Sequence, residues 1–292
     1  GFVGRRLMPH LRNHHEITVL SRNPAKVHQQ LGHDIKALPS LNDLENLDQF
    51  DAVINLAGEP IAEKRWSTEQ KLRICQSRWQ LTEQLVEKLN AGTQAPKVLI
   101  SGSAVGYYGR QGAALVDEDS SPHPEFSHKV CAQWEQLAQA AASEQTRVCC
   151  IRLAVVLGPD GGALKKMLPS YRLGLGGPIG SGKQYMSWIH IDDVVSLVLF
   201  LLEHDECSGA FNASAPEPVT NQQFSKTLAQ VLNKPHFARV PAWVMRLAFG
   251  EMADLLLTGQ RVMPVRLQCA GFHFRYPTLE KALKEILQPR ET

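Results

Sequence analysis

The sequence lacks several features that would assign a class of function directly. Its formal net charge is only +2, with 31 Lys and Arg against 29 Asp and Glu, so no excess of positive charge indicates a nucleic-acid partner. No apolar run approaches the length of a membrane span, and no signal-peptide pattern opens the sequence. We therefore expect a globular protein that binds a small molecule and contacts neither nucleic acid nor a membrane.

The six cysteines show no paired spacing. Cys75, Cys131, Cys149, Cys150, Cys207 and Cys269 include no C-x-x-C motif and no zinc-ligand pattern. Scattered cysteines of this kind are typical of a reducing compartment. The pattern predicts a cytoplasmic protein with mostly buried thiols and no structural metal.

The sequence also lacks a strand before its first helical pattern. Gly1-Phe2-Val3-Gly4 opens a helical pattern that runs into the strand-like residues 16–21. A parallel βαβ unit requires a strand before such a helix, so we predict that about ten residues are missing from the natural chain. Gly1 and Gly4 then match the second and third glycines of a G-x-x-G-x-x-G turn, with Phe2 between them, and bind the pyrophosphate of a dinucleotide.

Ser21 and Arg22 follow the next strand, where the adenosine ribose of a dinucleotide is recognised. An acidic residue there binds a ribose 2′-hydroxyl, whereas arginine pairs with a 2′-phosphate through its planar fork. Arg22 therefore favours NADP over NAD, and the alternative is a solvated loop arginine.

Buried strands alternate with helical patterns through the first half. Residues 51–58, 97–100 and 147–158 are apolar and β-branched, and helical patterns separate them. Such alternation predicts a Rossmann-type α/β fold, a doubly wound parallel sheet with helices on both faces. We expect a dinucleotide-binding domain over residues 1–160 that continues into 190–215, substrate-side segments at 161–189 and 216–240, and a helical C-terminal domain at 241–292.

Small residues follow two of these strands, where ligands bind in open α/β sheets. Leu56-Ala57-Gly58 is predicted to lie along the adenosine side of the cofactor, and Ser101-Gly102-Ser103 near the nicotinamide. The alternative for the serine stretch is an ordinary Gly/Ser turn. Arg78, on the helix after the first of these strands, is either near the cofactor or a surface charge.

The second half contains a misleading glycine run. Residues 177–183 match G-x-x-x-x-G-K, but Gln184 stands where a phosphate loop needs a hydroxyl, and no plain strand precedes the run. Nucleotide triphosphate hydrolysis is therefore excluded. His190, between two isoleucines, is expected to be a hydrogen-bonded structural histidine, with Asp192 capping the next helix.

Taken together, these residues resemble the extended short-chain dehydrogenase/reductase superfamily, and within it the branch of epimerase family proteins. The resemblance covers essentially the whole chain and is carried by these stretches: residues 1–4, 55–61, 64–66, 77–78, 101–109, 126–135, 172–182, 188–193 and the C-terminal tail. It implies a nucleoside-diphosphate-sugar-epimerase-like or NADP-dependent oxidoreductase activity. A homodimer is common in the superfamily.

The resemblance also exposes a further absence. The superfamily uses a Ser, a Tyr as proton donor or acceptor, and a Lys four residues after the Tyr. Ser103 fits the Ser, but alignment on Glu135 puts Ser127 at the Tyr and Cys131 at the Lys. The replacements for the missing proton donor are drawn from residues predicted near the site: Tyr107, Tyr108, His128, Lys129 and His190.

Three functions remain open from the sequence. The chain is an NADP-dependent oxidoreductase or epimerase-like enzyme with relocated acid and base groups, or a catalytically silent NADP-binding sensor such as a cell-division regulator, or a protein that binds a partner through residues 241–292. The sequence does not name a substrate.

Overall fold

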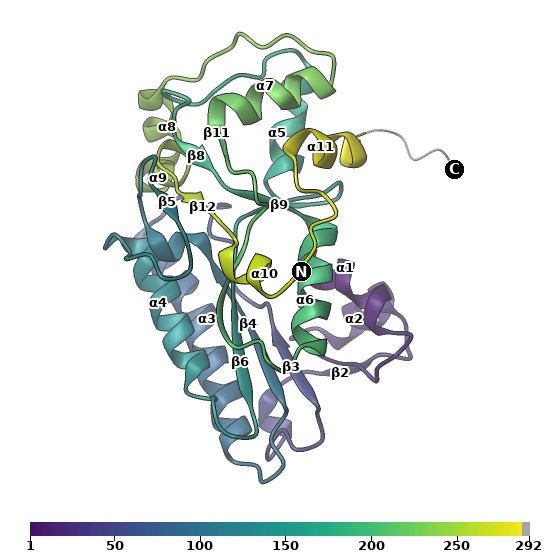
Figure 1. Cartoon of the computed structure of the whole chain (residues 1–292). Coiled ribbons are helices and arrows are strands. Elements are labelled where there is room, and N and C mark those ends of the chain that lie inside the picture. The colour runs from purple at the N-terminus through teal and green to yellow at the C-terminus, as the bar shows by residue number, and fades with distance from the viewer. Residues whose placement is uncertain (288–292) are drawn as a thin grey trace.

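The computed structural model describes residues 1–287. The predicted parallel sheet is present and doubly wound (Figure 1). Four parallel strands pair in the order β10-β6-β4-β3, and these are β3 (Ala52–Asn55), β4 (Val98–Ala104), β6 (Arg147–Leu153) and β10 (Gly209–Ala213). Successive residues of β6 point to opposite faces, and helices cover both, so the strand reads as one apolar run.

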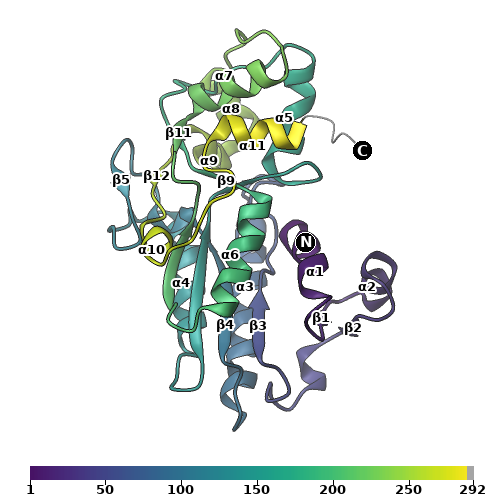
Figure 2. The ribbon, with the colours of Figure 1, turned by 45° about the vertical axis from the view of Figure 1, so that its right-hand side comes forward.

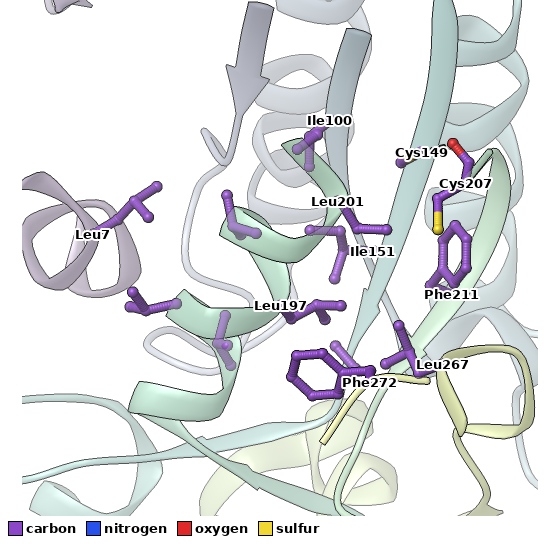
Figure 3. Packing of buried hydrophobic residues seen from close by; sticks show 14 of the residues in the cluster. Leu7, Ile100, Cys149, Ile151, Leu197, Leu201, Cys207, Phe211, Leu267 and Phe272 are labelled. Atoms are coloured by element: carbon purple, nitrogen blue, oxygen red, sulfur yellow. Dashed lines mark hydrogen bonds between the residues drawn. The ribbon is translucent and has the colours of Figure 1, made fainter. Parts of the chain in front are cut away.

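One face of the sheet packs on α3 (Thr68–Asn90) and α4 (Phe126–Gln139). Leu99 and Val148 lie in this core with Leu89. The other face packs on α6 (Ile191–Glu203) and α1 (Phe2–Leu11), where Ile100 and Ile151 meet Leu197, as Figure 3 shows. The alternation of Leu99 with Ile100 explains why this strand carries no polar side until residue 101.

The N-terminal strands form a separate pair. The parallel strands β1 (Thr18–Leu20) and β2 (Lys36–Leu38) flank α2 (Pro24–Leu31) and form no ladder with β3. Figure 2 shows this pair and α1 on the β3 side of the main sheet. The expected additional strand before Gly1 stays a prediction.

The segments that we expected on the substrate side, residues 161–189 and 216–240, lie with the C-terminal helix beyond the carboxyl ends of the strands (Figures 1 and 2). We call this part the substrate-side half. Its core joins α5 (Gly162–Arg172), α7 (Asn221–Val231) and α11 (Leu279–Leu287) around Trp188 and Phe224, both fully buried. The remaining elements are β5 (Leu115–Val116), β7 (Val155–Leu157), β8 (Tyr185–Met186), β9 (Trp188–His190), β11 (Val219–Thr220), α8 (Ala242–Phe249), α9 (Asp254–Leu257), β12 (Arg261–Val262) and α10 (Val265–Cys269).

The C-terminal segment that we expected to be a separate domain contacts the dinucleotide-binding half. β12 pairs with β5 of the first half, and α10 packs on β10, so residues 241–287 cross back onto the dinucleotide-binding half. The last residues of the predicted domain, 288–292, lie outside the described part of the chain. Within residues 1–287, none of the helices has the length and apolar character of a membrane span.

The cysteine prediction is confirmed for burial. Every cysteine is a free thiol, and all but Cys269 are buried.

Candidate functional site

The N-terminus of α1 has the geometry of an anion site. Phe2, Val3 and Gly4 form the first turn of a ten-residue helix, and their N–H groups have no intrahelical acceptor. A Cβ built on Gly1 or Gly4 meets nothing within 4 Å, so the backbone is open to a ligand. Free N–H groups and the helix dipole together favour a phosphate at this place.

Phe2 fixes this helix end to the substrate-side half. A Cβ on Gly158 would lie 2.7 Å from the Phe2 ring, and one on Gly161 would lie 2.5 Å from it. The ring is therefore seated against a loop in which only glycine fits. Phe2 offers its backbone to a ligand, while its side chain holds α1 against the loop that leads into α5.

Ser21 and Arg22 lie at the carboxyl end of β1, as predicted. The Ser21 hydroxyl donates to the Asn23 carbonyl oxygen at 3.3 Å, and Asn23 caps α2 by accepting from the Lys26 N–H at 3.0 Å. Arg22 is exposed and forms no ion pair with the described residues. It is available to an anion that reaches this edge.

Leu56, Ala57 and Gly58 form a loop directly after β3. Ala57 and Gly58 are exposed, and the Asn55 side chain accepts from the Ala57 N–H at 3.2 Å. Arg78 of α3 lies under this loop, since a Cβ on Gly58 would be 2.9 Å from its Cζ atom. The structure therefore places Arg78 against the loop after β3 and excludes the alternative of a freely solvated charge.

The serine stretch differs from its prediction. We expected Ser101 to Ser103 to follow a strand that ends at Ile100, but β4 continues to Ala104 because its ladder with β6 extends that far. Ser101, Gly102 and Ser103 are consequently buried within the strand. The residues that leave the sheet are Val105 to Tyr108, a 3-10 turn.

Ser103 belongs to a buried polar network. Its hydroxyl donates to Oε1 of Glu135 at 2.6 Å, and Glu135 accepts from Nε and Nη2 of Arg152 at 2.9 and 2.8 Å. Burial alone would lower the pKa of the Arg152 guanidinium, but the Glu135 carboxylate outweighs it and raises that pKa. Ser103, Glu135 and Arg152 thus satisfy one another.

Tyr108 extends the same network. Its hydroxyl donates to Oδ1 of Asn212 at 2.6 Å and accepts from Nη1 of Arg152 at 2.8 Å. The side chain is fully buried, and burial raises the pKa of Tyr108 to about 12. Tyr108 is held by these two neighbours, and its buried hydroxyl is not exposed to a ligand.

Tyr107 is placed differently. Its ring lies over Arg152, with the guanidinium carbon 3.5 Å from the ring centroid, and the residue is only half-buried. Its hydroxyl has no hydrogen bond to any residue in 1–287. His128 lies beside it, with ring centroids 5.3 Å apart, and Nδ1 of His128 donates to the Tyr107 carbonyl oxygen at 2.6 Å. Since a carbonyl only accepts, this bond leaves Nε2 of His128 as an acceptor.

The positions that correspond to the superfamily's Tyr and Lys do face the turn. A Cβ on Gly106 would lie 3.2 Å from Ser127 and 3.9 Å from Sγ of Cys131. Ser127 donates to Glu125 at 2.7 Å, and burial raises the pKa of Cys131 to about 11. Lys129, the remaining candidate, is exposed on α4.

His190 is the expected structural histidine, but the cap is corrected. We expected Asp192 to cap α6; instead His190 is the cap, because its Nδ1 accepts from the Asp192 N–H at 3.1 Å. Its Nε2 then donates to Glu285 of α11 at 2.9 Å, while Asp192 pairs with Arg6 of α1 at 2.7 Å. Ligand atoms of His190, Asp192 and Glu285 lie within 4.8 Å of one another, but these partners already occupy them.

The sequence reasoning missed two arginines. Arg152 is an arginine inside an apolar strand. Because a buried arginine is nearly always paired, its position indicated a buried carboxylate partner. Arg261 of β12 has its guanidinium 5.1 Å from the Tyr185 ring centroid, and its buried Nε has no hydrogen-bond partner among the described residues. No local pattern marks Arg261, because only tertiary packing brings β12 beside β5.

The comparisons with known proteins agree with the Rossmann-type fold. The profile of the NAD dependent epimerase/dehydratase family matches residues 1–214, and a domain of unknown function (DUF1731) matches residues 240–286. The chain is 40% identical over 297 residues to the epimerase family protein SDR39U1 homolog, chloroplastic, of Arabidopsis thaliana, covering 99% of this chain and 84% of that protein.

Similar proteins come from other organisms. Epimerase family protein SA0724 of Staphylococcus aureus (strain N315) is 36% identical over 99% of this chain and 96% of its own. The crystal structure of human epimerase family protein SDR39U1 with NADPH superposes with a TM-score of 0.89 at 36% identity, covering 98% of this chain and 96% of that one. The chain belongs to the NAD dependent epimerase/dehydratase family.

Proposed function

We propose that this chain is an NADP-dependent oxidoreductase whose proton donor is Tyr107. The observation that carries the proposal is the contrast between two adjacent tyrosines: Tyr108 is buried with its hydroxyl in use, whereas Tyr107 is half-buried and its hydroxyl has no hydrogen bond within residues 1–287. The resemblance of the fold to the NADPH-bound human protein supports the choice of cofactor.

The residues that we predict to bind the cofactor fit NADP. The open N-terminus of α1 suits the pyrophosphate, and Arg22 at the end of β1 suits a 2′-phosphate. When bound, NADPH supplies a hydride to a substrate carbonyl. Tyr107 would then give its proton to the carbonyl oxygen, with its ring held over the Arg152 guanidinium.

Arg261 is a cation that forms no ion pair with any residue in 1–287. Arg261 lies in the segment that reaches back to the Tyr107 turn, since Val262 packs with Tyr108 and Gln260 donates to the Gly109 carbonyl oxygen at 2.6 Å. A partly buried guanidinium without a carboxylate favours an anionic ligand. We infer a small carbonyl substrate with a carboxylate or phosphate group. A keto derivative of a nucleoside diphosphate sugar also carries such an anion.

Two measurements test the proposal. The first is a titration of the protein with NADPH and NADH; we expect NADPH to bind more tightly. The second follows absorbance at 340 nm with anionic carbonyl compounds, and Tyr107→Phe should lower kcat by about 10²- to 10⁴-fold.

Tyr108→Phe is the matched control, and it should reduce stability by about 1 kcal/mol without a comparable loss of kcat. Equal activity of Tyr107→Phe and the unaltered protein would overturn the assignment of the proton donor. NADPH binding without turnover of any tested substrate would favour the catalytically silent alternative.

A further inference from the structure

Arg78 lies between the loop that follows β3 and the Trp134 side chain. It projects from α3 into the space between the loop after β3 and helix α4, with its guanidinium against Gly58 and 5.2 Å from the centroid of the Trp134 ring. Trp134 in turn packs under Gly102 of β4, where a Cβ would lie 3.0 Å from it. Arg78 therefore lies at the carboxyl ends of β3 and β4.

The charge of Arg78 is not neutralised by a carboxylate. Within residues 1–287 its hydrogen bonds run to the Ile74 carbonyl oxygen at 3.0 Å and to the Ser77 hydroxyl at 3.4 Å, and it forms no ion pair. Burial lowers the pKa of the Arg78 guanidinium, and Glu59 and two thiols exert only weaker opposing effects. A half-buried cation without an ion pair keeps an uncompensated positive charge, which acts on any charged group of a ligand that lies beside it.

The order of the strands indicates which part of the dinucleotide reaches Arg78. Arg22 and the β1–β2 pair mark the adenosine end, and the N-terminus of α1 marks the pyrophosphate. Both lie on the β3 side of the main sheet in Figure 2, so the remaining half of an extended dinucleotide continues over β3 and β4. That half carries the nicotinamide ring, so in this inference Arg78 and the adjacent Gly58, which we expected on the adenosine side, lie against the nicotinamide half.

We propose that Arg78 makes the cofactor site selective for the reduced nucleotide, NADPH, over NADP⁺. The inference rests on the NADP binding proposed above. The oxidised nicotinamide ring carries a positive charge and the reduced ring does not, while the rest of the two nucleotides is the same. A fixed guanidinium with no counter-charge repels the oxidised ring only, and low local polarity strengthens that repulsion.

Isothermal titration of the full chain with each nucleotide tests the inference. We expect NADP⁺ to bind at least about tenfold more weakly than NADPH, since two like charges in contact repel by roughly this factor in a nearly water-like medium and by more at lower dielectric. A tenfold preference is equivalent to raising the reduction potential of the bound two-electron couple by about 30 mV. Arg78→Gln should reduce the preference to near unity mainly by improving NADP⁺ binding, and Arg78→Lys should retain most of it.

Two controls separate charge from contact. Adenosine 2′,5′-bisphosphate lacks the nicotinamide, so Arg78→Gln should leave its affinity unchanged. Arg73→Gln removes an exposed arginine of the same helix, paired with Glu69 at 2.6 Å, and should leave both nucleotide affinities unchanged.

The outcomes distinguish the inference from the function on which it rests. Equal weakening of NADPH and NADP⁺ by Arg78→Gln would show a phosphate or ribose contact and overturn the selectivity, while NADP binding itself stands. Equal affinities of the unaltered protein for the two forms would also overturn it. Failure of both nucleotides to bind would overturn the proposed function as well.

Discussion

Arg152 differs in its partners from three other arginines, Arg22, Arg78 and Arg261. Arg152 is buried, and Glu135, Tyr108 and the Glu118 carbonyl oxygen use its donors. Arg22, Arg78 and Arg261 form no ion pair within the described residues. The fold satisfies the charge of Arg152 internally and leaves the other three arginines without a carboxylate partner among residues 1–287.

This difference separates structural roles from binding roles. Ser103 and Tyr108 were proposed as catalytic from their positions in the sequence, yet both are members of the Arg152 network. A buried polar group that already has its full set of partners has little left to offer a substrate. The residues that retain unused donors are the ones that we assign to the cofactor and the substrate.

The largest effect is expected from breaking the satisfied group. Arg152→Met should destabilise the protein by about 3–5 kcal/mol, because it leaves the Glu135 carboxylate buried without its partner. Urea denaturation measures the change. The double variant with Glu135→Leu should recover a large part of the loss, and a near-neutral Arg152→Met would show that the network does not hold the fold.

An intermediate effect is expected at the open group. Arg22→Asp should weaken NADPH binding by roughly 100-fold, the order of magnitude of one lost charge-assisted hydrogen bond. Thermal stability should barely change, because Arg22 is exposed and has no ion pair among residues 1–287. Arg73→Asp is the matched charge reversal on an exposed surface. Equal losses for NADPH and NADH would show that Arg22 does not recognise the 2′-phosphate.

The smallest effect concerns a second satisfied cluster, at His190. Burial lowers the pKa of this imidazole below its ordinary value of 6.5, although Asp192 and Glu285 act in the opposite direction. The unfolded state therefore takes up a proton at a higher pH than the folded state, and stability falls as the pH drops through about 6.5 toward the folded pKa.

Urea midpoints between pH 8 and pH 5 measure this dependence. His190→Gln should flatten it, whereas His14→Gln, at an exposed histidine, should not. A steeper decline in the His190→Gln variant would contradict the assigned direction.

Much of the fold could be predicted from short-range patterns. The buried strands and the helices between them follow from hydrophobic periodicity, because residues 2 or 3.6 positions apart share a face wherever the chain packs. The same local logic predicts that the α1 N-terminus and Arg22 contact the cofactor, and this stays a prediction. Strand β4 was predicted too short, since Ser101 to Ser103 interrupt the apolar pattern although the ladder with β6 continues through them.

The candidate site could be predicted only in part. Tyr107 and Tyr108 are adjacent and chemically identical, and no sequence pattern states which of them enters the Arg152 network. Arg261 is 154 positions from Tyr107 in the sequence, and only the pairing of β12 with β5 brings its segment to the cleft.

The sequence by itself determined that this chain forms a doubly wound sheet with a dinucleotide-type helix end. Periodicity and glycine placement are properties of neighbouring residues, so they are legible without coordinates. The tertiary structure alone decided which charges are neutralised. A charge is satisfied or left open by groups that arrive from distant segments, and the cost of burying it depends on those groups rather than on its neighbours in the chain.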